Sequence, residues 1–327
     1  MALDVVAVGN LNVDLVFART RSMPRWGEEL LVPNFEMRAA GSAGYFAIAA
    51  SRLGMKCGLV SCVGGDAYGE FMLEELKRGG IEARIKVERK ALSGVCVSIV
   101  RNDGERAFVS YAGSLSKWGL ADVRRNFRFI SRARALYFGG YFFMQNLMAE
   151  KAEELMRSFS DAGVETVFDT GWDPEGWKPG TVREVRNVLR FVRVFLPNSK
   201  EAFRITGCSS PSKAAGKILG YGPQVVGIKL GHKGCMVANK DGKTKVPGFE
   251  CEAFDATGAG DAFNAGFMLG YLSGWDLMKT AKFANATGAL TVSSTRKGAE
   301  RFPGRKEVEE FLAENDPDSW RDLSDAR

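Results

Sequence analysis

The chain has 327 residues, of which 45% are hydrophobic, enough to bury the core of one large domain or of one domain with an appendage. No apolar stretch approaches the ~20 residues of a membrane span, so we expect a globular cytoplasmic protein. The six cysteines form no Cys-x2-Cys pair, which argues against a metal site built on cysteine. His232 is the only histidine and leaves histidine chemistry a single candidate residue.

The charge balance is basic, with 45 Lys and Arg residues against 39 Asp and Glu and a net charge of +6. Such a balance favours nucleic acid or, equally, a polyanionic small molecule as the partner. The densest basic run, between Arg124 and Arg134, lacks regularly spaced aromatic residues for stacking and is typical of the solvated face of a helix. We therefore expect a small-molecule substrate and neither a nucleic-acid nor a membrane partner.

The chain begins with a short apolar run at residues 4–9 that ends in glycine, a pattern typical of a buried parallel strand. Asn10, Asn12 and Asp14 follow it among apolar neighbours. Ligands of open α/β sheets bind outside the carboxyl ends of strands, so these polar side chains are candidates for contacting a ligand. The alternative is a turn held by side-chain hydrogen bonds to its own backbone.

Three segments alternate apolar with polar residues, which is typical of antiparallel hairpins: 29–38, 83–88 and 95–111, the last with a turn at residues 102–104. They interrupt a chain that otherwise alternates strand and helix. We therefore expect a small antiparallel sheet, formed by segments 14–38 and 83–112, that stands off a single domain spanning residues 1–327. Such a sheet would act as a lid over a substrate site.

Elsewhere, short apolar runs alternate with helical periodicity, which predicts a parallel sheet covered by helices on both faces. The expected strands are 57–63, 135–138, 164–169, 192–196 and 225–230. The expected helices are 146–162, 181–189, 199–206, 212–219 and 280–290. Residues 235–238 and 243–246 predict a terminal hairpin.

Two segments that follow expected strands bring further candidates to the same edge of the sheet. Asn198 and Glu201 begin one of them, and a plain helix start explains the pair equally well. Lys229, Gly231 and Gly234 follow the next strand, where a hairpin turn is the alternative.

The stretch 254–263 indicates the chemistry. Gly258 and Gly260 allow backbone angles closed to other residues, so successive N–H groups can form an anion-sized nest at the start of a helix. A carboxylate beside a phosphate costs electrostatic energy unless it removes a proton during the reaction, so Asp261 indicates phosphoryl transfer. A helix cap at Asp261 and a simple glycine turn are the alternative. A dinucleotide fingerprint is excluded because Phe263 stands where its third glycine is needed.

Residues 255–263 read Asp-Ala-Thr-Gly-Ala-Gly-Asp-Ala-Phe, which resembles the signature Asp-Thr-x-Gly-Ala-Gly-Asp-x-Phe of the ribokinase-like (PfkB) family of sugar and nucleoside kinases. The resemblance covers residues 4–314 and departs from the family pattern at Ala256, at Ala40 and at Tyr45, where asparagine is usual. It implies a doubly wound, mostly parallel α/β sheet flanked by helices, with a small antiparallel lid. It also implies ATP-dependent phosphorylation of a hydroxyl of a small sugar or sugar acid.

The resemblance implies roles for individual residues. Asp261 is expected to be the general base, with Gly258, Ala259 and Gly260 stabilising charge on the transferring phosphoryl group. The substrate contacts are expected from Asn12, Asp14, Gly41 and Tyr45. The ATP contacts are expected from Asn198, Lys229, Gly231, Gly234, Gly260 and Asn285. Asn198 and Glu201 are expected to organise Mg2+ through water, and Asp255 and Thr257 to share K+ with segment 291–298.

Two other functions remain open from the sequence. A nucleoside kinase of the same family would use Tyr45 and lid aromatics such as Phe108 to flank a planar base. A non-catalytic sugar-binding regulator would share the fold, although the intact Gly-Ala-Gly-Asp string argues against it. We also expect a homodimer formed through the lid.

Overall fold

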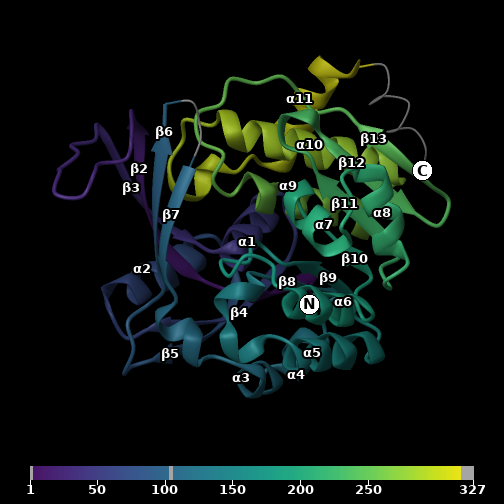
Figure 1. Cartoon of the computed structure of the whole chain (residues 1–327), viewed down its shortest axis with the longest axis horizontal. Helices are drawn as coiled ribbons and strands as arrows, with labels where there is room; N and C mark the ends of the chain where they lie inside the picture. The colour runs from purple at the N-terminus through teal and green to yellow at the C-terminus, as the bar shows by residue number, and fades with distance from the viewer. Residues whose placement is uncertain (1–2, 103–105, 318–327) are drawn as a thin grey trace.

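The computed structural model describes residues 3–102 and 106–317 and contains two β-sheets (Figure 1). The larger has the strand order β13-β12-β11-β10-β9-β8-β1-β4-β5. Its strands are β1 (Val5–Gly9), β4 (Cys57–Gly64), β5 (Glu82–Glu88), β8 (Ala135–Gly139), β9 (Glu165–Asp169), β10 (Val194–Phe195), β11 (Val225–Lys229), β12 (Cys235–Asn239) and β13 (Gly242–Val246). All neighbours from β5 to β11 are parallel, and β12 and β13 add an antiparallel hairpin. The doubly wound α/β fold expected from the sequence is confirmed.

Helices cover both faces of this sheet. The side chains of β1 alternate between the two cores, with Val5 and Ala7 in one and Val6 and Val8 in the other, which is why the run is continuously apolar. One core includes α1 (Ser42–Arg52), α2 (Ala67–Arg78), α9 (Ala259–Leu272), α10 (Leu277–Ser293) and α11 (Arg305–Asn315). The other includes α3 (Leu120–Arg124), α4 (Phe127–Ile130), α5 (Glu150–Asp161), α6 (Pro179–Leu189), α7 (Ser199–Thr206) and α8 (Pro211–Leu219). Short 3-10 helices are η1 (Gly113–Lys117), η2 (Tyr141–Phe143), η3 (Gln145–Leu147), η4 (Gly231–Lys233) and η5 (Gly298–Arg301).

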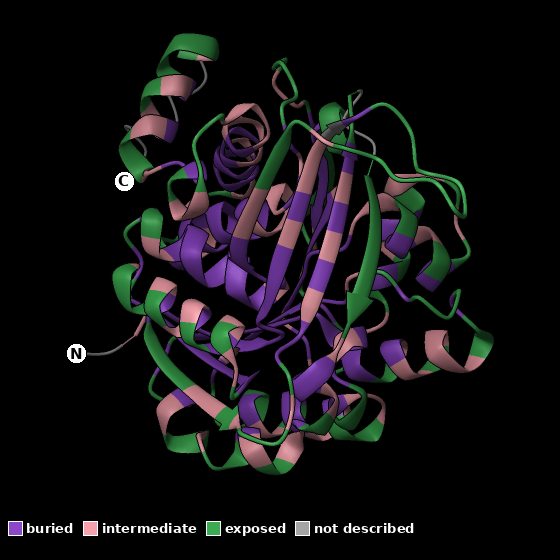
Figure 2. Ribbon diagram, turned by 90° about the vertical axis from the view of Figure 1, so that its left-hand side faces the viewer, coloured by how far each residue is buried: buried purple, intermediate pink, exposed green. Residues whose placement is uncertain are grey.

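The smaller sheet stands at the side of the main domain as the expected lid (Figure 1). Its order is β3-β2-β6-β7, with bounds β2 (Asn12–Thr20), β3 (Asn34–Ala40), β6 (Val95–Arg101) and β7 (Arg106–Tyr111). The outer pairs are antiparallel, and the central pair β2–β6 is parallel. Buried and half-buried residues alternate along β6, whereas every residue of the edge strand β7 is exposed (Figure 2).

One segment expected in the lid lies elsewhere. Residues 83–88 belong to β5, which pairs in parallel with β4 and forms an edge of the large sheet. An edge strand with one face toward solvent alternates in polarity just as a hairpin strand does, so period-two patterning alone cannot separate the two. The turn expected at residues 102–104 falls largely outside the described residues.

The parallel strands bring their carboxyl ends to one edge of the sheet. Asn10 follows β1, Asp169 ends β9, Asn198 follows β10 and Lys229 ends β11. Ligand sites of open α/β sheets lie at this edge. Within residues 3–102 and 106–317, no helix is long and apolar enough to cross a membrane.

Candidate active site

The start of α9 has the glycine turn on which the predicted anion nest depends. Gly258 precedes the helix with a φ of 76°, a left-handed conformation that favours glycine. A Cβ built there would lie only 3.2 Å from the ring of Tyr45. Asp261 lies half-buried in the first turn. Since no side chain of the described residues caps α9, helix capping does not explain why Asp261 stands in its first turn.

A lysine lies beside this nest. A Cβ built at Gly260 would be 3.8 Å from Nζ of Lys229, which places the ammonium group against the helix start. Lys229 Nζ donates to Oδ2 of Asp169 at 2.6 Å and to Oδ1 of Asn264 at 3.1 Å. Asn264 Nδ2 in turn donates to the same Asp169 oxygen at 2.6 Å. These three hydrogen bonds fix the ammonium group of Lys229 beside the start of α9.

Carboxylates crowd this edge of the sheet. Burial and the neighbouring Asp169 carboxylate raise the pKa of Asp261 well above its usual range, against the opposing effect of Lys229. Burial and Asp169 likewise raise the pKa of Glu201 to about 7. A positive charge near these groups would relieve their mutual repulsion, and the ammonium group of Lys229 supplies one.

Asn198 and Glu201 form a reciprocal cap at the start of α7. Asn198 Oδ1 accepts from the Glu201 amide at 3.0 Å, and Glu201 Oε2 accepts from the Asn198 amide at 2.8 Å. The helix-start interpretation therefore describes their local geometry. Each carboxylate oxygen keeps a second lone pair, so organisation of Mg2+ through water stays a prediction. Among the described residues, no three His, Cys, Asp or Glu side chains are arranged to hold a metal ion directly.

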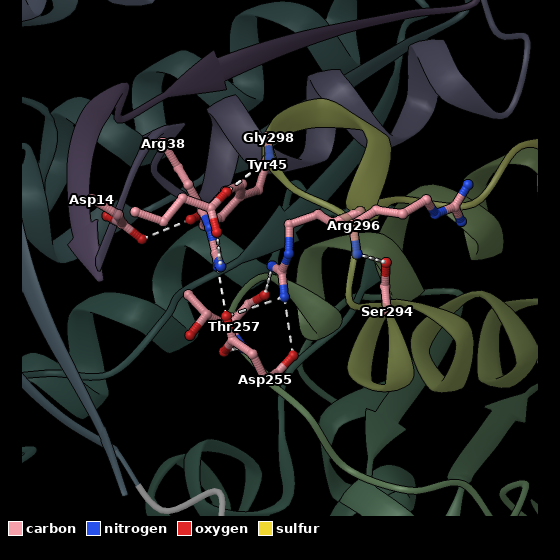
Figure 3. A network of polar contacts seen from close by, with 10 residues as sticks. Asp14, Arg38, Tyr45, Asp255, Thr257, Ser294, Arg296 and Gly298 are labelled. Atoms are coloured by element: carbon pink, nitrogen blue, oxygen red, sulfur yellow. Dashed lines mark hydrogen bonds and ion pairs between the residues drawn. The ribbon is translucent and has the colours of Figure 1, made fainter. Parts of the chain in front are cut away.

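Polar side chains form a continuous relay on the lid side of the site. Asn10 Nδ2 donates to Asn12 Oδ1 at 3.0 Å, and Asn12 Nδ2 donates to Asp14 Oδ1 at 2.8 Å. The Tyr45 hydroxyl donates to Asp14 Oδ2 at 2.8 Å (Figure 3). Gly41 lets the chain before α1 lie close to the backbone of Asn10, because a Cβ at residue 41 would lie 2.4 Å from the carbonyl oxygen of Asn10. The structure thus brings Asn12, Asp14, Gly41 and Tyr45 together.

The negative charge of ionised Asp14 should lower the free energy of unfolding. Burial raises its pKa to about 6, although hydrogen bonds from Tyr45 and Asn12 and the charge of Arg38 lower it. Because the pKa is higher in the folded state, stability from this group is fully present below pH ~3.8 and is lost as the pH rises through ~6. We expect Asp14→Asn to raise the free energy of unfolding near pH 8 by up to about 3 kcal/mol, with little gain near pH 4.

Urea unfolding of both proteins at the two pH values measures this effect, with Asp161→Asn at an exposed position as the control. A variant no more stable than wild type near pH 8 would show that Asp14 carries no such cost.

Asp255 and Thr257 lie in the loop before α9, and Figure 3 shows Arg38 pointing toward them. Arg38 and a second arginine, Arg301, are both buried. Arg38 Nη1 donates to Asp255 Oδ2 at 2.6 Å. Arg301 donates through Nη2 to the Asp255 carbonyl at 3.0 Å and through Nη1 to the Thr257 carbonyl. Although burial raises the pKa of Asp255, the charges of Arg301 and Arg38 lower it below its usual range.

Comparison with known proteins is decisive for the family. The model of the pfkB family carbohydrate kinases matches residues 2–301. The chain belongs to this family. It is accordingly a sugar kinase by class, as the motif at residues 255–263 predicted.

Curated relatives of this pfkB-family kinase include a ribokinase from Haemophilus influenzae, 29% identical over 323 residues, which covers 95% of this chain and 99% of the relative. A 5-dehydro-2-deoxygluconokinase from Clostridium perfringens is 25% identical over 318 residues, covering 94% and 92% of the two chains.

Solved structures share the fold. Arabidopsis thaliana ribokinase, complexed with ribose and ATP, aligns with a TM-score of 0.81 at 22% identity over 95% of this chain and 99% of its own. An Escherichia coli protein provisionally named Ribokinase II, complexed with ATP and Mg2+, aligns with a TM-score of 0.81 at 23% identity and the same coverage.

The remaining predicted nucleotide contacts of this pfkB-family kinase lie in two places. Gly231 is the first residue of η4 and Gly234 follows its last residue, with φ angles of 63° and 87°. Asn285, on α10, is buried and donates to the carbonyl of Pro247 at 2.9 Å. That bond ties α10 to the chain after β13, and contact of Asn285 with ATP stays a prediction.

Sequence reasoning missed several residues of the site. Asp169 ends a buried strand, so the edge rule applied to Asn10 would have singled it out. Asn264 is an amide three residues after Asp261 on an otherwise apolar helix, which was also a usable signal. No sequence pattern pointed to Arg38 or Arg301, because they lie 263 positions apart and come together where both contact Asp255.

Proposed function

We propose that this chain transfers the γ-phosphoryl group of ATP to a hydroxyl of a small sugar or sugar acid, with Asp261 as the general base. The observation that carries the proposal is the position of Asp261. It is a half-buried carboxylate in the first turn of α9, next to the left-handed Gly258 and near the fixed ammonium of Lys229. Its raised pKa strengthens it as a proton acceptor.

The polar relay suits a polyhydroxylated substrate. Each carboxylate oxygen of Asp14 accepts one hydrogen bond from the protein and keeps a lone pair for a substrate hydroxyl. Hydrogen bonds to a charged acceptor contribute about 1.5 to 3 kcal/mol each, enough to select polyols over apolar alcohols. Asn10 Oδ1 is buried without a hydrogen-bond partner among the described residues and offers a further acceptor.

Transfer then requires removal of a proton and stabilisation of charge. Asp261 takes the proton from the attacking hydroxyl, while Lys229 and the amides of residues 258–260 stabilise the negative charge that develops on the phosphoryl oxygens. Asn198 and Glu201 would hold Mg2+ through water, and the ion supplies further positive charge to the phosphate oxygens when bound. The lid excludes water from the site.

The environment of Tyr45 favours a sugar over a nucleoside. Its ring is only 4% exposed and packs against Phe302 with centroids 5.6 Å apart, and its hydroxyl is bonded to Asp14. A ring held in this way is poorly placed to stack on a base, so Tyr45 contributes mainly by orienting Asp14. The assembled nest and base also favour an enzyme over a non-catalytic regulator.

A substrate panel tests the proposal. We expect kcat/KM for at least one of ribose, fructose, 2-keto-3-deoxygluconate and 5-dehydro-2-deoxygluconate to exceed that for adenosine, inosine and cytidine by about tenfold or more, measured as ADP formation. Asp14→Ala should abolish most of this preference, whereas Tyr45→Phe, which removes one hydroxyl, should weaken it less. Nucleosides preferred by about tenfold would instead establish the nucleoside kinase.

Two expectations accompany this proposal. The cysteines 57, 62, 96, 208, 235 and 251 are all free, which supports a reducing compartment such as the cytoplasm.

A homodimer through the lid is supported by exposed Phe108, Val109 and Tyr111 on the edge strand β7. Sedimentation equilibrium checks the dimer, and a monomer at all accessible concentrations would contradict it.

A further inference from the structure

The loop before α9 is where the family resemblance placed a potassium ion, and most of its oxygen atoms already accept hydrogen bonds from the protein. The carbonyls of Asp255 and Thr257 both accept hydrogen bonds from Arg301. The Asp255 side chain accepts from Arg38 through Oδ2 and from the Thr257 amide through Oδ1 at 2.8 Å. Two of these donors are guanidinium groups, so a potassium ion at these oxygens would lie against two fixed positive charges. Thr257 Oγ1 is buried without a hydrogen-bond partner among the described residues.

The charges of this loop are also balanced without an added ion. Glu36 pairs with Arg38 at 2.7 Å, Arg38 pairs with Asp255 at 2.6 Å, and Arg301 lies 3.3 Å from the Asp255 carboxylate. Two carboxylates thus face two guanidinium groups. Arg38, Asp255 and Arg301 are 6%, 2% and 1% exposed, so an additional cation would meet two positive groups where water screens little. These residues do not fit a bound potassium ion.

The same network joins the lid to the loop that precedes α9 (Figure 3). Glu36 and Arg38 lie on β3, and Arg38 is opposite Asp14 in the register of β2 with β3. Glu36 Oε1 accepts from the amide of Gly298, the first residue of η5, at 2.8 Å. Arg301, the last residue of η5, reaches the loop at Asp255 and Thr257. Arg301 therefore holds the loop that leads into the first turn of α9, where Asp261 lies.

We propose that the guanidinium group of Arg301, supported by Arg38, takes the place of a monovalent cation, so that this kinase works without potassium. Both arginines are positioning residues: they fix the carbonyls of the loop that precedes the Gly258 nest. The inference rests on the proposed function, because it assigns to this loop a part in phosphoryl transfer.

The first test uses the wild-type enzyme. At constant ionic strength, kcat in potassium, sodium and tetramethylammonium chloride should agree within about twofold, and the thermal midpoint of the ligand-free protein should be the same in all three. A potassium-specific gain in kcat beyond that range, or a potassium-specific rise in the midpoint, would overturn the proposal. The midpoint needs no substrate, so this arm holds even if the sugar assignment fails.

The second test removes the guanidinium group. Arg301→Ala frees two carbonyls and removes one of the two guanidinium partners of the Asp255 carboxylate. We expect kcat in tetramethylammonium to fall by about 10²-fold because the loop loses its fixed geometry. Potassium or guanidinium chloride should then restore part of kcat and raise the thermal midpoint of the variant. Arg296→Ala, in the same segment but paired at the surface with Glu307, is the matched control and should respond to neither.

Arg301→Lys covers the case in which the alanine variant does not fold. It keeps one charge but cannot donate to both carbonyls in the planar geometry of arginine, so it should have a reduced kcat with little change in KM for the sugar. Wild-type kcat in either variant, with no response to potassium or guanidinium, would show that Arg301 does not position the loop.

Discussion

Asp261→Asn is expected to lower kcat by roughly 10² to 10⁴ while leaving ATP affinity nearly unchanged, because a positioned general base acts on the accepting hydroxyl and not on the donor. The carboxylate sits in the first turn of α9 next to the nest, and asparagine keeps its volume while removing its basicity. Steady-state kinetics gives kcat, and calorimetric titration with ATP gives the affinity.

The pH profile provides an independent readout of the same residue. Since burial and Asp169 raise the pKa of Asp261, the acidic limb of kcat/KM should lie well above the pKa of an ordinary aspartate, and activity should fall as the pH drops through it. The part of the limb that belongs to Asp261 should vanish in the residual activity of Asp261→Asn, whereas the contribution of Asp14, whose pKa burial raises to about 6, should remain. A variant that keeps more than about a tenth of wild-type kcat, with the limb intact, would remove Asp261 from this role.

Lys229→Met should lower kcat by about 10² to 10³, the usual effect of losing one group that stabilises transition-state charge. The ammonium lies against Gly260 and is oriented by Asp169 and Asn264. The single change also leaves the buried Asp169 carboxylate without its ion pair, which by itself costs about 3 to 5 kcal/mol of stability.

The double variant Lys229→Met with Asp169→Asn separates these effects. We expect it to recover the thermal midpoint lost in Lys229→Met, because no unpaired charge remains buried, without recovering kcat. Lys233→Met, at an exposed position in η4, is the control for loss of a lysine near the site. A double variant with kcat within about tenfold of wild type would assign Lys229 a structural role.

Local patterns in the chain determined most of the fold. The apolar runs and helical periodicities predicted the strands and helices of the large sheet, since a residue's exposure to solvent repeats with the geometry of its own element. At segments 83–88 and 197–201, local patterns could not decide between two structures. An edge strand alternates like a hairpin strand, and Asn198 with Glu201 satisfies a helix cap as well as a metal shell.

The sequence by itself determined the glycine turn before α9 and the carboxylate in its first turn, because glycine conformations and a helix start are properties of neighbouring residues. Only the tertiary structure decided what surrounds them. Tyr45 donates a hydrogen bond to Asp14 and packs against Phe302, and Lys229 is paired with Asp169. Arg38 and Arg301 converge on Asp255 from β3 and η5, and no local pattern specifies that meeting, because it depends on how distant elements pack against one another.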